Sequence, residues 1–271
     1  MKRQLKEEEE KKIIYNYTIL KLGQKESGKE FNVSDYTVKK ILRKYDIHIR
    51  SVQEVRTEKQ YQVNHDYFNH QSHDMAYWLG ILGSDGTVSK NKNMVVIELQ
   101  RKDKELLVKL NASIDNERDV KDYLNNSKQT ENSKLYFYSY NIKQQLKTYN
   151  IVPNKTYNPK YDFPTKLKSN YYIDYIRGLF DGDGAIYKSG SSIRFQIDSS
   201  CKNIIIKLQQ IFLSYNIELN WCVEPRQNIN IYRLYCYGNN KIQKIYDLLY
   251  STPSNLFLKR TKDKFEELLN S

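Results

Sequence analysis

The chain has 271 residues, enough for one large domain or for two to three small ones that each bury a hydrophobic core. No apolar run reaches the roughly 18 to 20 residues of a membrane-spanning helix, and the charged start MKRQLKEEEE lacks the apolar centre of a secretory signal, so we expect a cytoplasmic protein. Because 44 Lys and Arg stand against 32 Asp and Glu, the net charge is +12, which favours an acidic partner and nucleic acid first.

The cysteines and tyrosines indicate less about function than the net charge does. Cys201, Cys222 and Cys236 are odd in number and widely spaced, which excludes a disulfide framework and a CxxC-type zinc site. The 24 tyrosines suit stacking on bases and hydrogen bonding to phosphate, but tyrosine also builds ordinary sheets. A basic protein that is merely soluble therefore remains an alternative at this point.

Three short helices are predicted near the N-terminus. The first lies within residues 11–22, the second runs from about Lys25 to Phe31, and the third begins after Ser34, a preferred helix N-cap. The third helix has an apolar stripe at i, i+3, i+4 and i+7 formed by Val38, Ile41, Leu42 and Tyr45. Its opposite face holds Tyr36, Thr37, Lys39, Lys40, Arg43 and Lys44.

This arrangement resembles helix-turn-helix domains, in which the final helix enters the major groove of DNA. We therefore predict a DNA-binding domain over residues 1–55, with that basic face as the DNA contact; a plain three-helix packing module is the alternative. Residues 56–74 show little periodicity and are predicted to be a linker. The linker's three histidines, His65, His70 and His73, have no matching Cys or His cluster elsewhere, which disfavours a histidine-metal nuclease site.

The remainder of the chain contains an internal repeat. Residues 77–88, YWLGILGSDGTV, align without a gap on residues 175–186, YIRGLFDGDGAI, at an offset of 98. The register persists, because LLVKL at 106–110 falls on IIIKL at 204–208. Two copies of one folding unit are therefore predicted, over residues 75–165 and 166–271.

Each copy is predicted to be a helix ending at Asp-Gly, a strand pair, a helix, further strands and a closing helix. Strands are expected at 95–99, 135–140, 192–197 and 231–237, and helices at 104–110, 142–149, 203–212 and 240–250. Alternation places Tyr136, Tyr138 and Tyr140 on one strand face. The open sheet faces are predicted to bind DNA, with contacts from Arg101, Tyr138, Arg194, Arg233 and Tyr235.

The spacing inside the repeated motif suggests a paired site. Gly80 and Gly178 lie about two turns before the final glycine, where a missing side chain lets two helices approach closely. If the two motif helices pack together, Asp85 and Asp183 lie side by side at their ends. Two adjacent carboxylates repel each other unless a cation lies between them, and Mg²⁺ held by one or two carboxylates, waters and phosphates suits that arrangement.

The two motifs, WLGILGSDG at 78–86 and IRGLFDGDG at 176–184, resemble those of LAGLIDADG homing endonucleases in their single-chain, two-repeat form. The resemblance covers about residues 75–271. It implies an α+β fold of two pseudo-symmetric αββαββα repeats, here preceded by the small all-α domain. It also implies Asp85 and Asp183 as catalytic metal ligands, with the backbone carbonyls of Ser84 and Gly182 facing the metals.

The resemblance extends to the end of each repeat. The segment YNIVPNKTYNPKYDFP at 149–164 is similar to the family segment that ends the first repeat, which implies Lys155 as a catalytic basic residue. The second repeat has LFLKRTKDKF at 256–265, with Arg260-Thr261 where family members often have Arg-Lys. Lys262 is taken as the second catalytic lysine, and Lys259 on the other side of the pair stays an alternative. Asp181 is replaced by Gly83 in the first motif, so it is expected to give local support.

The implied function is a site-specific double-strand DNA endonuclease that uses Mg²⁺, with Mn²⁺ as a substitute. It would act as a DNA-associated monomer without an obligate protein partner, of the kind that phages and mobile elements encode. The alternative is a protein of the same fold without nuclease activity, either an RNA maturase or a DNA-binding transcription regulator. An EF-hand at residue 181 is disfavoured, because Ala185 and Ser192 occupy its fifth and twelfth positions.

Overall fold

The computed structural model describes residues 5–52, 54–55, 62–126 and 129–270. The chain divides into two compact units, residues 1–60 and 61–271. Of the predicted linker, residues 56–61 lie outside the described residues. The following residues contain the 3₁₀ turn η2 (Tyr67–Asn69), in which Phe68 is buried and its N–H donates to Gln145 Oε1 at 3.1 Å. Residues 62–74 therefore pack into the second unit.

The N-terminal unit is all-α. It contains α1 (Glu7–Thr18), α2 (Gln24–Gly28), the 3₁₀ turn η1 (Lys29–Phe31) and α3 (Asp35–Lys44). Ser34 caps α3 by accepting a hydrogen bond from the Thr37 N–H at 3.3 Å. The helices pack through a small core made of Ile13, Tyr17, Val38, Ile41 and Leu42. The helical spacing of these apolar residues directs them to one side of each helix, which leaves the polar face of α3 in solvent.

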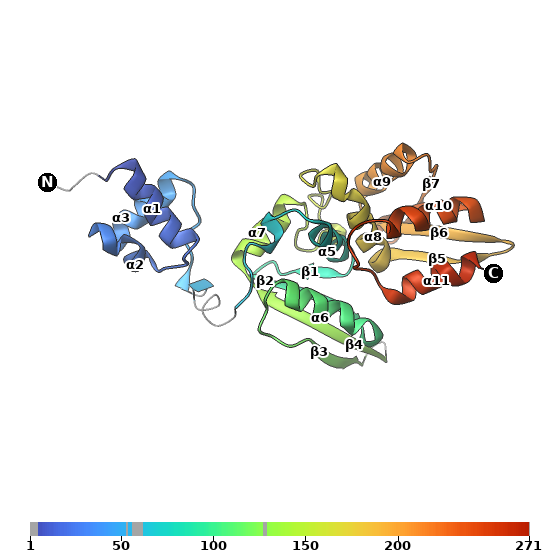
Figure 1. Cartoon of the computed structure of the whole chain (residues 1–271), viewed down its shortest axis with the longest axis horizontal. Helices are drawn as coiled ribbons and strands as arrows, with labels where there is room; N and C mark the ends of the chain where they lie inside the picture. Colours follow the sequence, from blue (N-terminus) through green and yellow to red (C-terminus); the bar gives the residue numbers. More distant parts are fainter. Residues whose placement is uncertain (1–4, 53, 56–61, 127–128, 271) are drawn as a thin grey trace. The chain divides into compact units, whose positions relative to one another are not determined.

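The second unit contains two four-stranded antiparallel sheets of the same strand order, β1-β2-β4-β3 and β5-β6-β8-β7 (Figure 1). The first sheet consists of β1 (Gly86–Val88), β2 (Met94–Gln100), β3 (Lys121–Asn125) and β4 (Thr130–Tyr138). The second consists of β5 (Gly184–Ser189), β6 (Ser192–Ser199), β7 (Asn220–Arg226) and β8 (Ile229–Tyr237). This repetition confirms the predicted α+β fold of two similar repeats.

The motif helices α5 (His73–Ser84) and α8 (Tyr172–Asp183) pack on each other between the two sheets (Figure 1). In the first repeat, α6 (Lys104–Ser113) lies against β2 and β4, and α7 (Tyr140–Thr148) follows. In the second, α9 (Lys202–Ser214) lies against β6 and β8, followed by α10 (Asn239–Tyr250) and α11 (Lys259–Leu269). One hydrophobic core runs through both repeats. Among the described residues, no helix has the length and apolar character needed to span a bilayer.

The predicted strand over 135–140 is wrong at its end. Strand β4 ends at Tyr138, and the Ser139 side chain accepts a hydrogen bond from the Ile142 N–H at 3.1 Å. Ser139 thereby caps α7, and Tyr140 is the first residue of that helix. Tyr140 therefore does not share a strand face with Tyr136 and Tyr138.

Candidate active site

Two glycines allow the motif helices to meet backbone to backbone. A Cβ placed on Gly80 would lie 2.6 Å from the Leu179 nitrogen, and one placed on Gly178 would lie 3.0 Å from the Gly80 Cα. Contacts this short leave no room for a side chain at either position. The absence of a Cβ at both glycines therefore sets how closely the two repeats approach.

The close approach brings the C-terminal ends of the helices together. Asp85 directly follows α5, and Asp183 is the last residue of α8. A Cβ placed on Gly182 would lie 3.0 Å from Asp85 Oδ2, so the Asp85 carboxylate lies against the last turn of α8. The charge of Asp85 also raises the pKa of Asp183. The structure thus brings the two aspartates into one site.

Both aspartates have raised pKa values. Loss of hydration raises the pKa of Asp183 to about 7, the Asp85 charge adds to the shift, and Lys155 opposes it. Asp183 nevertheless stays exposed to solvent, although protein atoms surround it on several sides. Burial likewise raises the pKa of Asp85, opposed by Lys155 and Arg260. Two ionised carboxylates so placed are disfavoured until a cation neutralises them.

The donor atoms fit a hard cation. Within the described ranges, no three His, Cys, Asp or Glu side chains gather as a metal-binding group. Two carboxylates from two helix ends leave the other coordination positions to water and phosphate oxygens, which is how proteins usually hold Mg²⁺. Ser84 and Gly182, the predicted carbonyl ligands, lie against each other, and the Ser84 hydroxyl donates to the Gly80 and Ile81 carbonyls at 3.1 Å.

Lys155 lies beside both aspartates. It begins the 3₁₀ turn η4 (Lys155–Tyr157), and its ammonium group donates a hydrogen bond to the Gly86 carbonyl. Burial lowers the pKa of Lys155, and the charges of Asp183 and Asp85 oppose that shift. Lys155 and Asp183 line a pocket of about 270 Å³, large enough for water and a phosphate group. An ammonium group in this pocket can stabilise negative charge next to the carboxylates.

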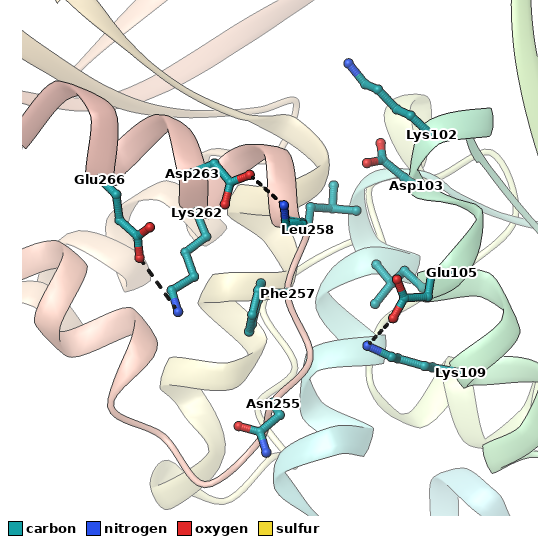
Figure 2. Close-up of a pocket in the computed structure, with 12 residues that line it drawn as sticks. Lys102, Asp103, Glu105, Lys109, Asn255, Phe257, Leu258, Lys262, Asp263 and Glu266 are labelled. Atoms are coloured by element: carbon teal, nitrogen blue, oxygen red, sulfur yellow. Dashed lines mark ion pairs between the residues drawn. The ribbon is translucent and has the colours of Figure 1, made fainter.

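Lys262 does not join this group. Its ammonium nitrogen lies 4.8 Å from the centre of the Phe257 ring and 3.8 Å from Glu266 Oε1. It lines a separate pocket of about 460 Å³ between α6 and α11 that contains neither Asp85 nor Asp183 (Figure 2). That pocket is larger than the one that Asp183 and Lys155 line, but neither of the two aspartates lines it.

Arg260 is the second-repeat cation that reaches the site. Its Nε donates to Asp103 Oδ2 of the first repeat at 2.9 Å, and its charge lowers the pKa of Asp85. Sequence reasoning missed both Arg260 and Asp103. The basic run at the end of the second repeat indicated the segment, but only the contact between repeats selects Arg260.

A further carboxylate lies beside Asp183. Asp198 on β6 raises the pKa of Asp183 and accepts hydrogen bonds from Arg233 Nε at 2.8 Å and Nη2 at 2.6 Å. Arg233, a predicted DNA contact, also lies 3.0 Å from Glu224 Oε2 and is therefore paired within the protein. At the repeat offset, the first copy has Gln100, so comparing the copies would have shown Asp198 as an extra charge.

Arginines stacked on tyrosines lie on both sheets. The Arg194 guanidinium lies 5.0 Å from the Tyr235 ring centre and donates to the Tyr237 hydroxyl at 2.7 Å. In the first repeat, Arg118 lies 4.7 Å from the Tyr136 ring and 5.4 Å from the Tyr138 ring. Such stacking holds a guanidinium group in one orientation. Arg118 was missed because it lies outside the predicted strands.

The other predicted DNA-contact residues differ in solvent exposure and in whether their side chains form ion pairs within the protein. Arg101 is bound at 3.1 Å to Glu131 and at 3.8 Å to Asp122. On α3, Thr37 and Lys39 are half-buried, whereas the exposed residues are Tyr36, Lys40, Arg43 and Lys44. Lys44 binds Glu10 of α1 at 2.6 Å. The part of the α3 face that is directed to solvent therefore centres on Tyr36, Lys40 and Arg43.

Asp181 lies in a different environment from Asp183. Its carboxylate is buried, and Oδ2 accepts hydrogen bonds from the Tyr77 hydroxyl and the Leu258 N–H, both at 2.8 Å. Burial raises the pKa of Asp181 to about 7 against the effect of these bonds. Asp181 thereby connects α8 to α5 and to the start of α11.

Comparison with known proteins finds a matching family model and a related sequence. Residues 170–249 match the family model of the LAGLIDADG-like domain. An uncharacterized protein of Methanocaldococcus jannaschii is 23% identical over 222 residues, which are 77% of this chain and 73% of the relative.

Similar solved structures include a LAGLIDADG homing endonuclease, I-LtrWI, bound to its target DNA, with 15% identity, a TM-score of 0.48 and coverage of 76% of this chain and 91% of that chain. Another is full-length WhiA from Thermatoga maritima, with 12% identity and a TM-score of 0.47; the match covers 76% of this chain but only 64% of WhiA. The family resemblance seen in the sequence is confirmed over residues 170–249, which match the model of the LAGLIDADG-like domain.

Proposed function

We propose that this protein is a site-specific endonuclease that hydrolyses both strands of duplex DNA, with Mg²⁺ held by Asp85 and Asp183 and Mn²⁺ as a substitute. The observation that carries the proposal is the pairing of one carboxylate from each motif helix, with Lys155 beside both. A structural role alone does not account for two neighbouring carboxylates with raised pKa values, one of which lines a pocket together with Lys155.

The residues of the site have different proposed roles. A divalent cation, when bound, supplies Lewis acidity toward the phosphate and lowers the pKa of water. Asp85 and Asp183 would hold it, assisted by the carbonyls of Ser84 and Gly182. Lys155 stabilises charge that develops on the phosphate oxygens, and Arg260 serves that role nearer Asp85. Because each repeat contributes one aspartate, each repeat would act on one strand of the DNA.

DNA binding would use two surfaces. The sheets present stacked arginines, Arg194 and Arg118, that suit contacts to base edges or phosphates. The N-terminal unit presents Tyr36, Lys40 and Arg43 of α3, which we propose as a helix-turn-helix-type contact. Linking two binding units in one chain raises affinity without a protein partner. We accordingly propose a DNA-associated monomer, of the kind that mobile elements encode.

The test is selection of cleaved sites from a random duplex library with Mg²⁺, followed by Asp85→Asn and Asp183→Asn. Each substitution is expected to abolish double-strand cleavage while DNA binding is retained, because Asn keeps the shape but removes the charge. Asp247→Asn on the exposed face of α10 is the matched control and should cut normally. Undiminished cutting by either active-site variant would refute the assignment.

A second candidate is a DNA-binding regulator without nuclease activity. The observation that favours it is the separate N-terminal unit with its own basic face, which suits a protein that binds DNA without cleaving it. Specific binding to a selected site without cleavage, in Mg²⁺ or Mn²⁺, would support this candidate.

A further inference from the structure

We propose that Asp181 is a positioning residue that fixes the start of α11 and so holds Arg260 beside Asp103 and Asp85. The inference rests on the proposed function, because it concerns the cation that assists one half of the nuclease site. It assigns a role to the motif position at which the second repeat has an acidic residue and the first has none, Asp181 against Gly83.

The Asp181 side chain contacts the residue that precedes α11. The Asp181 carboxylate is 1% exposed, so its hydrogen bonds are shielded from water. One of these bonds comes from the N–H of Leu258, the residue immediately before α11. Since Leu258 is itself buried, this bond fixes both the position and the direction in which α11 begins.

Helix α11 in turn contacts the first repeat. Arg260 follows Leu258 by two residues, within the first turn of α11, and its Nε lies 2.9 Å from Asp103 Oδ2. The Asp103 side chain is 5% exposed, so it offers a fixed partner. Figure 2 shows Leu258 and Asp103 on facing sides of the space between the repeats. A shift of the α11 start would therefore move Arg260 away from Asp103.

In the first repeat, a different hydrogen bond at the same motif position holds the segment that carries Lys155. The Gly83 carbonyl accepts a hydrogen bond from the Tyr161 hydroxyl at 2.7 Å, and Tyr161 lies in the segment that carries Lys155. A Cβ on residue 83 would lie 3.3 Å from that hydroxyl and 3.1 Å from Leu179 Cδ2. The second repeat thus uses a side chain, and the first uses its backbone, to hold the cation-bearing segment.

Amide hydrogen exchange tests the anchor without reference to cleavage. Asp181→Ala removes the acceptor of the Leu258 N–H, whereas Asp181→Asn keeps an oxygen in its place. We expect exchange at Leu258 and in the first turn of α11 to be about tenfold or more faster in the Ala variant, and close to wild type in the Asn variant. Tyr77→Phe removes the other hydrogen bond to the same carboxylate and should leave α11 protection unchanged. Equal protection in the Ala variant and wild type would overturn the proposal.

Strand-resolved cleavage tests the consequence for the site. Asp181→Ala and Arg260→Gln should each slow cutting of the same one strand, and the double variant should be no slower than the slower single variant, because both act through one contact. Additive effects, or equal slowing of both strands, would contradict positioning through Arg260. If wild-type protein cuts no DNA, the proposed function fails, while the exchange results still decide whether Asp181 anchors α11.

Discussion

Gly80 and Gly178 meet across the two motif helices, with 3.0 Å between the Gly80 Cα and the place that a Cβ of residue 178 would occupy. This contact sets the separation of the repeats and thereby the position of the two aspartates. Its consequences for stability can be measured.

Gly178→Ala is expected to destabilise the protein by about 3 kcal/mol or more, because the new methyl group would overlap the Tyr77 carbonyl and press on the backbone of α5. Urea unfolding followed by circular dichroism measures the change. Gly190→Asn is the control, since nothing lies within 4 Å of a Cβ there and Asn tolerates its positive φ of 61°. An unchanged unfolding midpoint for Gly178→Ala would contradict the close backbone contact.

Arg177→Met should cost about 3 to 5 kcal/mol of unfolding free energy. The guanidinium group is 1% exposed and donates to the Leu249 carbonyl at 2.6 Å, the Leu256 carbonyl at 2.8 Å and Asp174 Oδ1 at 3.0 Å. Its removal leaves these buried acceptors without a donor. Arg101→Met, at an exposed ion pair, is the control and should change stability by less than about 1 kcal/mol. Similar losses in both variants would argue against a special role for Arg177.

Mg²⁺ should stabilise the wild-type protein against heat, by about 1.4 kcal/mol at ten times the dissociation constant. Asp85→Asn and Asp183→Asn should lose this effect, because each removes one of two carboxylate ligands. In EDTA, the same variants should melt at or above the wild-type temperature, since the repulsion between the carboxylates is relieved. Thermal unfolding with and without Mg²⁺ gives both results. If Mg²⁺ stabilised the variants as much as the wild-type protein, the ion would bind at another site.

Combined Lys40→Ala and Arg43→Ala should weaken DNA binding and reduce the slope of log affinity against log salt by about 0.9 for each phosphate that the protein no longer neutralises. Cleavage chemistry should persist at saturating protein, since these residues belong to the N-terminal unit. Lys44→Ala is the matched control and should alter the slope less, because that ammonium group already binds Glu10. An unchanged slope in the double variant would show that this face of α3 does not contact DNA.

The sequence alone determined the repeat, the α+β class and the positions of the motif residues. Two copies in register predict two similar units, and the Gly and Asp spacing predicts a helix pair with carboxylates at its end. These features are local or periodic, so they can be read along the chain. The same holds for the α3 cap, where Ser34 and the apolar stripe after it suffice.

Only the tertiary structure decided which basic residue of the second repeat lies beside Asp85. Lys259, Arg260 and Lys262 look alike in a basic run, and the contact of Arg260 with Asp103, 157 residues away in the chain, is what separates them. The same reason applies to Asp198, whose effect on Asp183 arises from the pairing of strands. The charge of a side chain is written in the sequence, but the groups that it neutralises depend on how distant segments pack.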